Sequence, residues 1–546
     1  MKKIIIFILL IFTTLFISCS CNASDIDDFI IYDGILYKYV GSDEIVRIPE
    51  TYYQNGKRMN VTEIESSAFD KNETIETIIL PNTIKIIREF SFNDLNIKRI
   101  KLSKNIENIS ENTFYNCSQL QYLNYDNNNL SKYTNLKVIG NHAFRDTSVD
   151  NLILPEGLTS IGLNLFNEYY YKERFPDFYT EYGNLYYLGT KDNPYEYMIN
   201  IKEGANEYYL HKDTKLMGIY PDKTKLHIEE GNEYYKIEDE SLYQIKENRI
   251  VSVKRTDNEI IMCDEKAEIL GKKVYSGYLD TKDTIIVPNN IKVIEQEVFF
   301  DVFLNKIVIG KGVEYIHPEA FNYCYISEGF EVDEENQYYK SVNGVIYTKD
   351  GKHLVRAPNR VVTEELTIEE GVEVIDSYAF WSCQYRVVNA PDTLTEIKDY
   401  AFQDNGKLTT FNQTTPLKII GKLSFMGSAI TKILLDDSIK SLEKGTFDLC
   451  YNLRIENLPT NLEFIGPWAL YGIKEYSEEV LPLSLKYIMK NAISVDMPMN
   501  ITIGKNVKYI DERGILFNSN FDIIKISEEN NFYKIKDGVI VYKDKG

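Results

Sequence analysis

The residue types that carry most enzyme and metal chemistry are scarce in this chain, and their spacing keeps them apart. The five histidines are His142, His211, His227, His317 and His353. No two of them lie within four residues of each other, so the helical histidine pair that binds zinc in metalloproteases is absent. The sequence also has no Gly-rich phosphate loop and no G-x-S-x-G motif for a serine nucleophile. We therefore predict that the protein is not an enzyme and uses no cofactor and no metal ion.

One acidic cluster resembles a calcium site in composition. It consists of Glu331, Asp333, Glu334 and Glu335. The cluster lacks the evenly spaced Asp or Asn residues and the turn glycine of a calcium-binding loop. Our interpretation is a solvated, charged face of the protein.

Cysteine occurs at one repeated position. Four of the seven cysteines lie three residues after a phenylalanine: Cys117, Cys324, Cys383 and Cys450. Other small residues take the same position elsewhere: Asn72, Thr147, Asn405 and Ser428. A disulfide ladder or a metal site would need cysteines in adjacent turns of the chain, and none of the four is adjacent to another. We predict buried free thiols, because Cys packs as a small hydrophobic residue.

Tyrosine gives the strongest indication of binding, with 42 copies against 2 of tryptophan. Tyrosine supplies rigid, amphipathic contact area at a small entropic cost, which suits the binding of proteins or sugars. The candidate binding surface consists of Tyr169, Tyr170, Tyr171, Tyr186, Tyr187, Tyr195, Tyr197, Tyr208, Tyr209, Tyr234 and Tyr235. The alternative is that these rings pack across hairpin strands, where aromatic pairs are favoured in any case.

The elements that must position these residues follow from a repeated anchor, a small residue followed by phenylalanine. The anchors are Phe69, Phe92, Phe114, Phe144, Phe166, Phe299, Phe321, Phe380, Phe402, Phe425 and Phe447. Leu470 and Ile493 continue the series, and consecutive anchors from Phe380 onward are 22 or 23 residues apart. A period of this length is typical of a solenoid, in which each unit buries its apolar face only against its neighbours.

Each unit combines two kinds of pattern. An alternating segment such as Leu152 and Leu154 predicts a half-buried strand, and Pro155 ends it where no further ladder donor is needed. A second apolar pair follows, and the anchor then enters a short helical or 3₁₀ turn. The predicted fold class is therefore an α/β repeat solenoid with stacked parallel strands.

Several hairpins interrupt the repeats. The dipeptide Asp33-Gly34 between two short apolar runs is typical of a type I′ turn, and related segments lie at 339–351 and 533–546. Hairpins at the two ends fit caps that cover exposed strand edges. The predicted organisation is a capping hairpin at 25–60, repeats at 61–166, degenerate repeats with Tyr-rich insertions at 167–297, repeats with a hairpin insertion at 298–358, repeats at 359–530 and a hairpin at 531–546.

The first 23 residues have the pattern of an export signal. Lys2 and Lys3 precede the apolar run from Ile4 to Ile17, and small residues follow. Cleavage after Ala23 would release a secreted protein. The segment also resembles a lipoprotein signal, in which Cys19 becomes the lipidated first residue, and a third alternative is a retained anchor. Any contact with a membrane would then pass through the lipid or the anchor.

The repeat unit resembles that of the BspA-like leucine-rich repeats of bacterial surface proteins. The segments that carry the resemblance are VEVIDSYAFWSC (372–383) and LTEIKDYAFQDN (394–405). The resemblance implies a leucine-rich-repeat right-handed superhelix, surface display and adhesion to host proteins or cells, and it implies no catalytic residue.

We therefore expect an exported, non-catalytic protein, either lipid-anchored at the cell surface or outer membrane or simply secreted. Its expected partner is a protein of the host, of the matrix or of another surface. The net charge of −21 argues against nucleic acid. The alternatives are a glycan-binding module, a structural surface protein without a specific ligand, and an enzyme hidden in residues 167–297.

Overall fold

A computed structural model describes two compact units, Met1–Tyr234 and Tyr235–Gly546, and each is considered by itself. The described residues are 24–70, 72–124, 127–149, 152, 155, 158, 160–161, 185–189, 197–200, 208–210, 215–217, 226–228, 230–231, 235–238, 241–245, 249–252, 267–272, 274–275, 284–477, 480–495, 499–511, 513–515, 521–536 and 539–543.

A single turn of the solenoid is built from two short strands and a tight turn. In the turn of Phe402, the outer strand is β32 (Val387–Asn389) and the inner strand is β33 (Glu396–Ile397). The inner strand is only two residues long, and of its two side chains Ile397 is fully buried. A single turn cannot cover this side chain, so the turns must stack to bury it.

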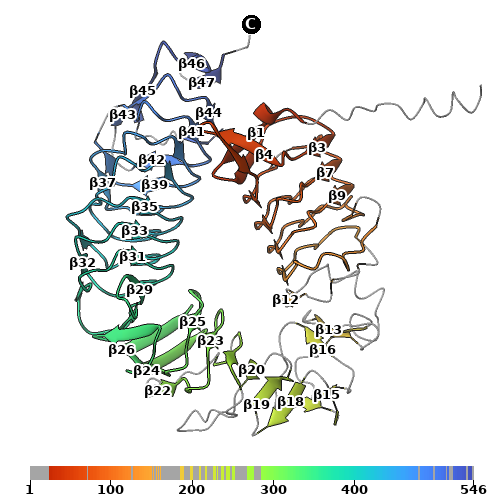
Figure 1. Ribbon diagram of the computed structural model, residues 1–546. Helices are drawn as coiled ribbons and strands as arrows, with labels where there is room; N and C mark the ends of the chain where they lie inside the picture. The colour runs from red at the N-terminus through yellow and green to blue at the C-terminus, as the bar shows by residue number, and fades with distance from the viewer. Residues whose placement is uncertain are drawn as a thin grey trace, which may run out of the picture. The chain divides into compact units, whose positions relative to one another are not determined.

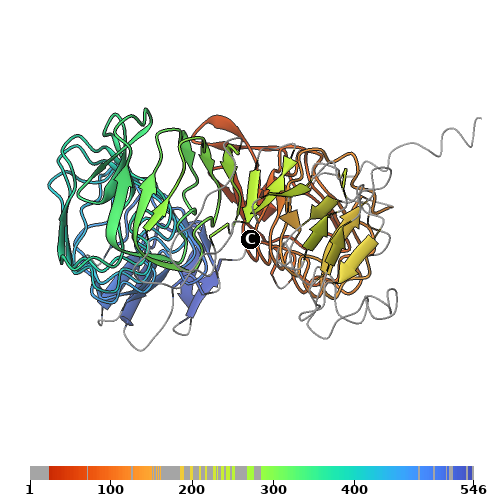
Figure 2. The same ribbon diagram turned by 90° about the horizontal axis from the view of Figure 1, so that it is seen from below.

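Adjacent turns are bonded in parallel and in register. β33 pairs with β31 (Val374–Ile375) on one side and with β35 (Ile419–Ile420) on the other. The bonding extends beyond the strands, since the amide of Phe380 donates to the carbonyl of Ala401 at 2.7 Å. Figure 1 shows these turns as successive layers, and in Figure 2 the turns from β31 onward are seen largely one behind another.

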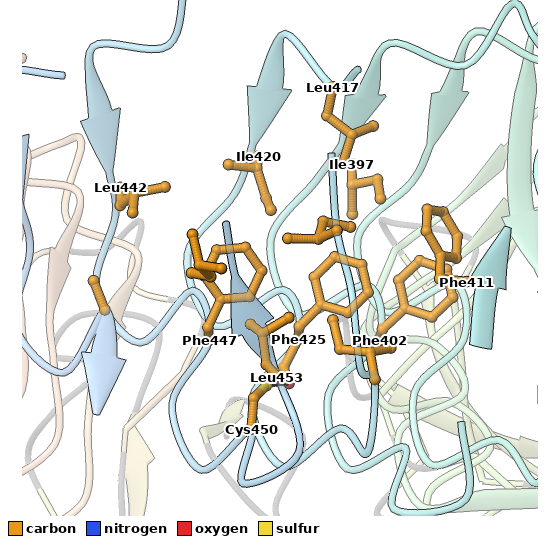
Figure 3. Packing of buried hydrophobic residues seen from close by; sticks show 14 of the residues in the cluster. Ile397, Phe402, Phe411, Leu417, Ile420, Phe425, Leu442, Phe447, Cys450 and Leu453 are labelled. Carbon is orange, nitrogen blue, oxygen red and sulfur yellow. Dashed lines mark hydrogen bonds between the residues drawn. The ribbon is translucent and has the colours of Figure 1, made fainter. Parts of the chain in front are cut away.

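The anchor phenylalanines form a ladder through the core. Every anchor phenylalanine in the described part of the chain is at most 1 % exposed. The rings of Phe402 and Phe425 are stacked at 4.9 Å, and those of Phe425 and Phe447 at 5.9 Å. Figure 3 shows these three rings in a row, with Ile397, Ile420 and Leu442 beside them. Phe166 lies outside the described residues.

The first unit contains one long sheet, and its strands are parallel from β2 onward. In spatial order they are β1 (Phe29–Tyr32), β2 (Ile35–Tyr39), β6 (Glu63–Ile64), β8 (Ile86–Ile87), β10 (Asn108–Ile109), β11 (Val138–Ile139) and β12 (Ser160–Ile161). The outer strands are β3 (Ile45–Arg47), β7 (Thr77–Ile79) and β9 (Arg99–Lys101). The remaining strands are β4 (Thr51–Gln54), β5 (Lys57–Asn60), β13 (Leu185–Gly189), β14 (Tyr197–Asn200), β15 (Tyr208–Leu210), β16 (Lys215–Met217) and β17 (Leu226–Ile228).

The second unit has three successive inner sheets. The first contains β18 (Tyr235–Glu238), β19 (Ser241–Gln244), β20 (Arg249–Ser252), β21 (Ile269–Leu270), β23 (Val293–Ile294) and β25 (Tyr315–Ile316). The next contains β27 (Tyr339–Val342), β28 (Val345–Thr348), β29 (His353–Arg356), β31, β33 and β35. The last contains β36 (Ser441–Leu442), β38 (Phe464–Ile465), β41 (Tyr487–Ile488) and β44 (Tyr509–Ile510).

Smaller sheets complete the second unit. They are formed by β22 (Thr284–Ile286), β24 (Val302–Ile309) and β26 (Cys324–Val332), and by β30 (Glu365–Thr367), β32 and β34 (Thr410–Asn412). Strand pairs are β37 (Arg454–Ile455) with β40 (Glu475–Tyr476), β39 (Leu470–Ile473) with β42 (Ile493–Val495), β43 (Met499–Ile503) with β45 (Phe521–Ile526), and β46 (Tyr533–Lys536) with β47 (Val539–Tyr542).

The hairpins use the turn chemistry expected from their sequences. Asp33 and Gly34 have φ of 46° and 80°, and Asn343 and Gly344 have φ of 50° and 79°. Positive φ at both central residues is the requirement of a type I′ turn. Between residues 25 and 60 the structure has two hairpins, β1–β2 and β4–β5, where the sequence predicted one.

The stacked parallel solenoid with inserted hairpins is confirmed, but the helical part of the predicted α/β fold is a minor feature. The helix whose bounds the structure gives within the described residues is a short 3₁₀ segment, η1 (Ile26–Asp28). The anchor segments form hydrogen-bonded turns because left-handed residues bracket them. Tyr400 has φ of 61° and Asp404 has φ of 59°, which leaves only three residues between them. Three residues are too few to propagate an α-helix.

Candidate binding surface

The tyrosines predicted to form a binding surface lie in the first unit, apart from Tyr235 at the start of the second. Tyr169, Tyr170, Tyr171, Tyr195 and Tyr234 lie outside the described residues. β13 and β14 form an antiparallel pair in which Tyr186 lies opposite Ile199, Tyr187 opposite Met198, and Tyr197 opposite Leu188. Tyr208 and Tyr209 are in β15, and Tyr235 opens β18 opposite Gln244. In these registers the backbone of each tyrosine is paired with a residue of another type, and its role in binding stays a prediction.

The repeated cysteine position has a clear structural use. All four cysteines are buried and free. The thiol of Cys117 donates to the carbonyl of Phe92 at 2.8 Å, and Cys450 donates to Phe425 at 3.0 Å. Asn405 takes the same position and donates to Phe380 at 2.7 Å. In these three turns a small donor at this position bonds the carbonyl of the preceding anchor, whereas Thr147 donates to its own anchor, Phe144, at 2.8 Å and the buried hydroxyl of Ser428 has no partner among the described residues. Burial raises the pKa of the Cys117 thiol to about 12, so this thiol stays protonated at neutral pH.

Cys324 and Cys383 lie on either side of a buried arginine that the sequence did not single out. Arg356 is 2 % exposed and donates to the backbone carbonyls of Phe321 and Tyr378. Its guanidinium lies 5.9 Å from the centre of the Phe321 ring. Ala357 takes the anchor position of its turn, since its amide donates to the carbonyl of Ala379 as anchor amides donate to the next turn. Because alanine stands where other turns have phenylalanine, the side chain of Arg356 enters the core. Burial lowers the pKa of this guanidinium.

The histidines and the acidic cluster serve local contacts. Nδ1 of His317 accepts a hydrogen bond from the amide of Glu319 at 3.1 Å, and Nδ1 of His353 lies 3.0 Å from Asp376. Glu331 and Glu335 form ion pairs with Lys306 and Lys311 at 2.6 and 2.7 Å. Across the described residues, no group of three or more His, Cys, Asp or Glu side chains could hold a metal ion.

A set of aromatic rings in the second unit forms the strongest candidate surface. We call it the aromatic face, and its members are Phe300, Phe303, Tyr323, Tyr325, Tyr378, Trp381 and Tyr400. The indole of Trp381 meets Tyr323 edge-on at 4.9 Å and lies 6.4 Å from Tyr325. Tyr325 stacks on Phe303 at 4.7 Å. The rings come from turns on both sides of the β27–β28 hairpin.

Solvent reaches this face. Tyr323 is 50 % exposed, whereas Trp381 beneath it is 7 % exposed. Arg360 is exposed and covers Tyr325, with its guanidinium 4.5 Å from the ring centre. A buried tryptophan below an exposed tyrosine, with an arginine beside them, is the composition in which binding energy concentrates at protein interfaces.

Reasoning from the sequence missed the aromatic face. The available signal was the residue type directly after the anchors. Phe300 and Trp381 follow their anchors immediately, and Tyr323 follows Phe321 by two residues. Aromatic residues at these positions in three anchor segments indicate one shared surface once the turns are known to stack.

The geometry and the repeat pattern agree with a known family. The family model described as "BspA type Leucine rich repeat region (6 copies)" matches residues 56–173, 236–340, 359–429 and 418–544. The chain belongs to this family. BspA-type repeats therefore account for most of the sequence, including every turn of the aromatic face.

Solved structures give matches of low identity. A leucine-rich cell surface protein from Faecalibacterium prausnitzii is 16 % identical over 91 % of this chain and 92 % of its own, with a TM-score of 0.27. A leucine-rich repeat protein from Eubacterium ventriosum is 12 % identical over 92 % and 96 %, with a TM-score of 0.36. The pneumococcal vaccine antigen PcpA is 17 % identical over 91 % and 96 %, with a TM-score of 0.26.

No curated protein matches this BspA-type chain. Among the residues that the structure describes, no helix has the length and apolar character needed to cross a lipid bilayer.

Proposed function

We propose that this BspA-type protein is an exported bacterial cell-surface protein, without catalytic activity, that mediates adhesion by binding another protein. Its family is typically found outside the cell, and the first 23 residues have the pattern of an export signal, with Cys19 as the lipidated residue in one alternative. The observation that carries the proposal is the aromatic face, a pre-ordered set of partly exposed rings on a rigid stack of turns.

Pre-order is the physical basis of the mechanism. The rings of the aromatic face are already held by their neighbours, as Tyr325 is by Phe303 and Arg360. Little side-chain entropy is then lost on binding, so a modest contact from each turn adds up to useful affinity. A protein partner suits the face better than nucleic acid, because the net charge of −21 repels phosphates.

The test is binding of the purified chain to an array of matrix proteins and glycans. A variant with Tyr323→Ala and Tyr325→Ala should lose a saturable interaction. The matched control is Tyr451→Ala, which removes a tyrosine that is 59 % exposed and lies outside the aromatic face. Retained binding in the double variant would move the site elsewhere, and a chain that binds nothing would favour a structural surface protein.

Two further experiments separate the alternatives. Changing the tyrosines between 167 and 240 to serine tests the surface predicted from the sequence. Removing the glycans of a bound partner tests the second candidate function, glycan binding, because affinity for the protein itself survives that treatment. Loss of binding on deglycosylation would make the glycan the ligand.

A further inference from the structure

One position of the repeat has an unusual backbone conformation in turn after turn. The residue directly before the anchor pair has φ between 54° and 61° in all members of what we call the left-handed column. The members are Ser67, Phe90, Asn112, His142, Glu297, Tyr378, Tyr400, Leu423, Gly445, Trp468 and Asn491. Glycine, asparagine and aspartate adopt this conformation most readily, and bulky side chains are disfavoured in it.

Tyrosine occupies two consecutive members of this column. Tyr378 and Tyr400 both have φ of 61°. Their rings are stacked at 4.7 Å with 5° between their planes. Phe90, Leu423 and Trp468 are also bulky members of the column. Tyr378 and Tyr400 differ from them in that they occupy adjacent turns and their rings stack.

The two ends of this tyrosine stack differ. At one end the ammonium of Lys422 lies 5.7 Å from the centre of the Tyr400 ring, and Asp399 holds it at 3.7 Å. At the other end the preceding turn is shortened. Only two residues lie between Leu354 and Ala357, against four between the equivalent Ile375 and Phe380. The shortened turn therefore contributes no member to the left-handed column beside Tyr378.

Acidic and phenolic groups lie near Tyr378 instead. Burial raises the pKa of Tyr378, and the charges of Glu319 and Asp399 and the phenol of Tyr323 add to that rise. Glu319 is held by the side chains of Gln296 and Asn322, which donate to it at 3.0 and 3.2 Å. A fixed carboxylate beside an aromatic ring favours a cation.

The surrounding segment is strongly acidic. Between residues 295 and 335 the basic side chains are Lys306 and Lys311, against ten acidic ones: Glu295, Glu297, Asp301, Glu314, Glu319, Glu328, Glu331, Asp333, Glu334 and Glu335. Both lysines are paired with glutamates of this segment. Glu295 and Glu297 are paired with Arg249 and Lys272 from outside it, and the remaining acidic residues, Glu319 among them, leave the segment an excess of negative charge. A negative surface of this kind attracts positively charged partners and speeds their association.

We propose that the Tyr378–Tyr400 stack, with Tyr323 and Glu319, binds a lysine or arginine side chain from a basic segment of a protein partner. The partner's cation lies against the ring of Tyr378 as Lys422 lies against Tyr400. The same contact recurs within the chain, where Lys508 lies 4.8 Å from the centre of the Tyr487 ring. This inference rests on the proposed function as a protein-binding surface and names the chemistry of the partner.

The experiment measures the affinity of the purified chain for oligoarginine, for oligolysine and for an uncharged Gln/Ser peptide of equal length. The chain should bind the two basic peptides and not the uncharged one. The variants Tyr378→Asn and Tyr400→Asn remove the rings, keep the net charge and suit the backbone conformation. Each should weaken binding of the basic peptides by about tenfold, and thermal unfolding of each variant checks that the chain stays folded without the ring stack.

The matched control is Leu423→Asn, at the next member of the left-handed column. It should leave peptide affinity unchanged, since Leu423 has no aromatic ring. Equal affinity of Tyr378→Asn and the parent chain for oligoarginine would overturn the inference, because the remaining attraction would then be unspecific charge. A Glu319→Gln variant should weaken binding as well.

Failure of this inference is distinguishable from failure of the proposed function. A chain that binds a matrix protein through Tyr323 and Tyr325 but ignores basic peptides keeps its proposed function and loses the basic partner. A chain that binds neither loses both. Binding of glycans in place of either would assign the aromatic face to the alternative function.

Discussion

The ring of Phe402 lies between those of Phe380 and Phe425, at centroid distances of 4.5 and 4.9 Å. The side chain is fully buried, and both faces of the ring are in contact with another ring. Stacked aromatic pairs contribute roughly 0.5–1.5 kcal/mol beyond the burial of their area. Single anchor residues therefore carry a large share of the stability of each turn.

Replacing one anchor should leave a cavity that the rigid stack cannot close. We expect Phe402→Ala to lower the free energy of unfolding by roughly 3–5 kcal/mol, measured by urea denaturation. The control is Lys407→Ala, which removes an exposed side chain of the same turn. A loss below about 1 kcal/mol for Phe402→Ala would mean that the ladder is not close-packed.

A single carboxylate should make stability depend on pH. Asp448 is half-buried, its Oδ1 has no hydrogen-bond partner among the described residues, and burial raises its pKa to about 6 from 3.8. The folded state therefore binds the proton more tightly than the unfolded state, and stability should rise as pH falls from about 7 to about 5. Asp448→Asn should remove this dependence and add roughly 1 kcal/mol at neutral pH, after allowance for solvent screening.

Thermal unfolding at several pH values checks this expectation. The control is Asp301→Asn, which removes an exposed carboxylate in another turn. The role assigned to Asp448 would be contradicted if the parent chain lost stability as the pH fell from neutral to mildly acidic and the Asp448→Asn variant did not.

At the scale of elements, two hairpins attach to the solenoid by the same contacts. The amide group of Asn336 donates to the carbonyls of Gly310 and Val313 at 2.9 and 3.0 Å, and Asn530 repeats this with Gly504 and Val507. Both asparagines are fully buried. In each case the tyrosine three residues further on accepts a hydrogen bond from an inner strand: Tyr339 from Ile316 at 3.1 Å and Tyr533 from Ile510 at 2.9 Å.

Removing this contact should loosen the hairpin from the stack. Asn336→Ala removes the side-chain donor to Gly310 and Val313 and the acceptor of the Tyr338 and Tyr339 amides, so we expect a loss of roughly 2–4 kcal/mol in the free energy of unfolding. Hydrogen exchange should quicken in β27 and β28. Gln337→Ala, at the exposed neighbouring residue, is the control. Unchanged exchange in the hairpin of the Asn336→Ala variant would contradict a docking role.

At the scale of the whole molecule, stability is a sum over turns and over contacts between adjacent turns. The backbone bonds reflect this, since Phe402 donates to the next turn at Ser424 and accepts nothing from distant ones in the described hydrogen bonds. The two compact units have separate apolar cores. A local change should therefore act on its neighbours first.

Hydrogen exchange of Phe402→Ala should show a graded effect. Protection should fall most in the turns of Phe380 and Phe425, less in the turn of Phe447, and not in the first unit around Phe69. The reciprocal variant Phe92→Ala should affect the turns of Phe69 and Phe114. A uniform change along the chain in either variant would contradict nearest-neighbour coupling.

The sequence by itself determined the repeat. The spacing of the anchors and the alternation before them are local patterns, and stacking is the arrangement that buries both. The Asn-Gly and Asp-Gly turns were equally readable, because few residues accept positive φ at two successive positions. Small residues three positions after the anchors, such as Cys117 and Asn405, indicated a position with little space. The sequence did not indicate that these two side chains donate to the carbonyl of the preceding anchor.

Only the tertiary structure decided which turns form helix and where the aromatic face lies. Tyrosine is not a residue type for which a left-handed backbone is expected. The sequence at Tyr378 and Tyr400 therefore did not indicate that the anchor segments form turns and not helices. Tyr323 and Trp381 meet because the shortened turn at Arg356 sets the register between two groups of repeats. Contacts between turns depend on that register, which is a property of the stack and not of any one unit.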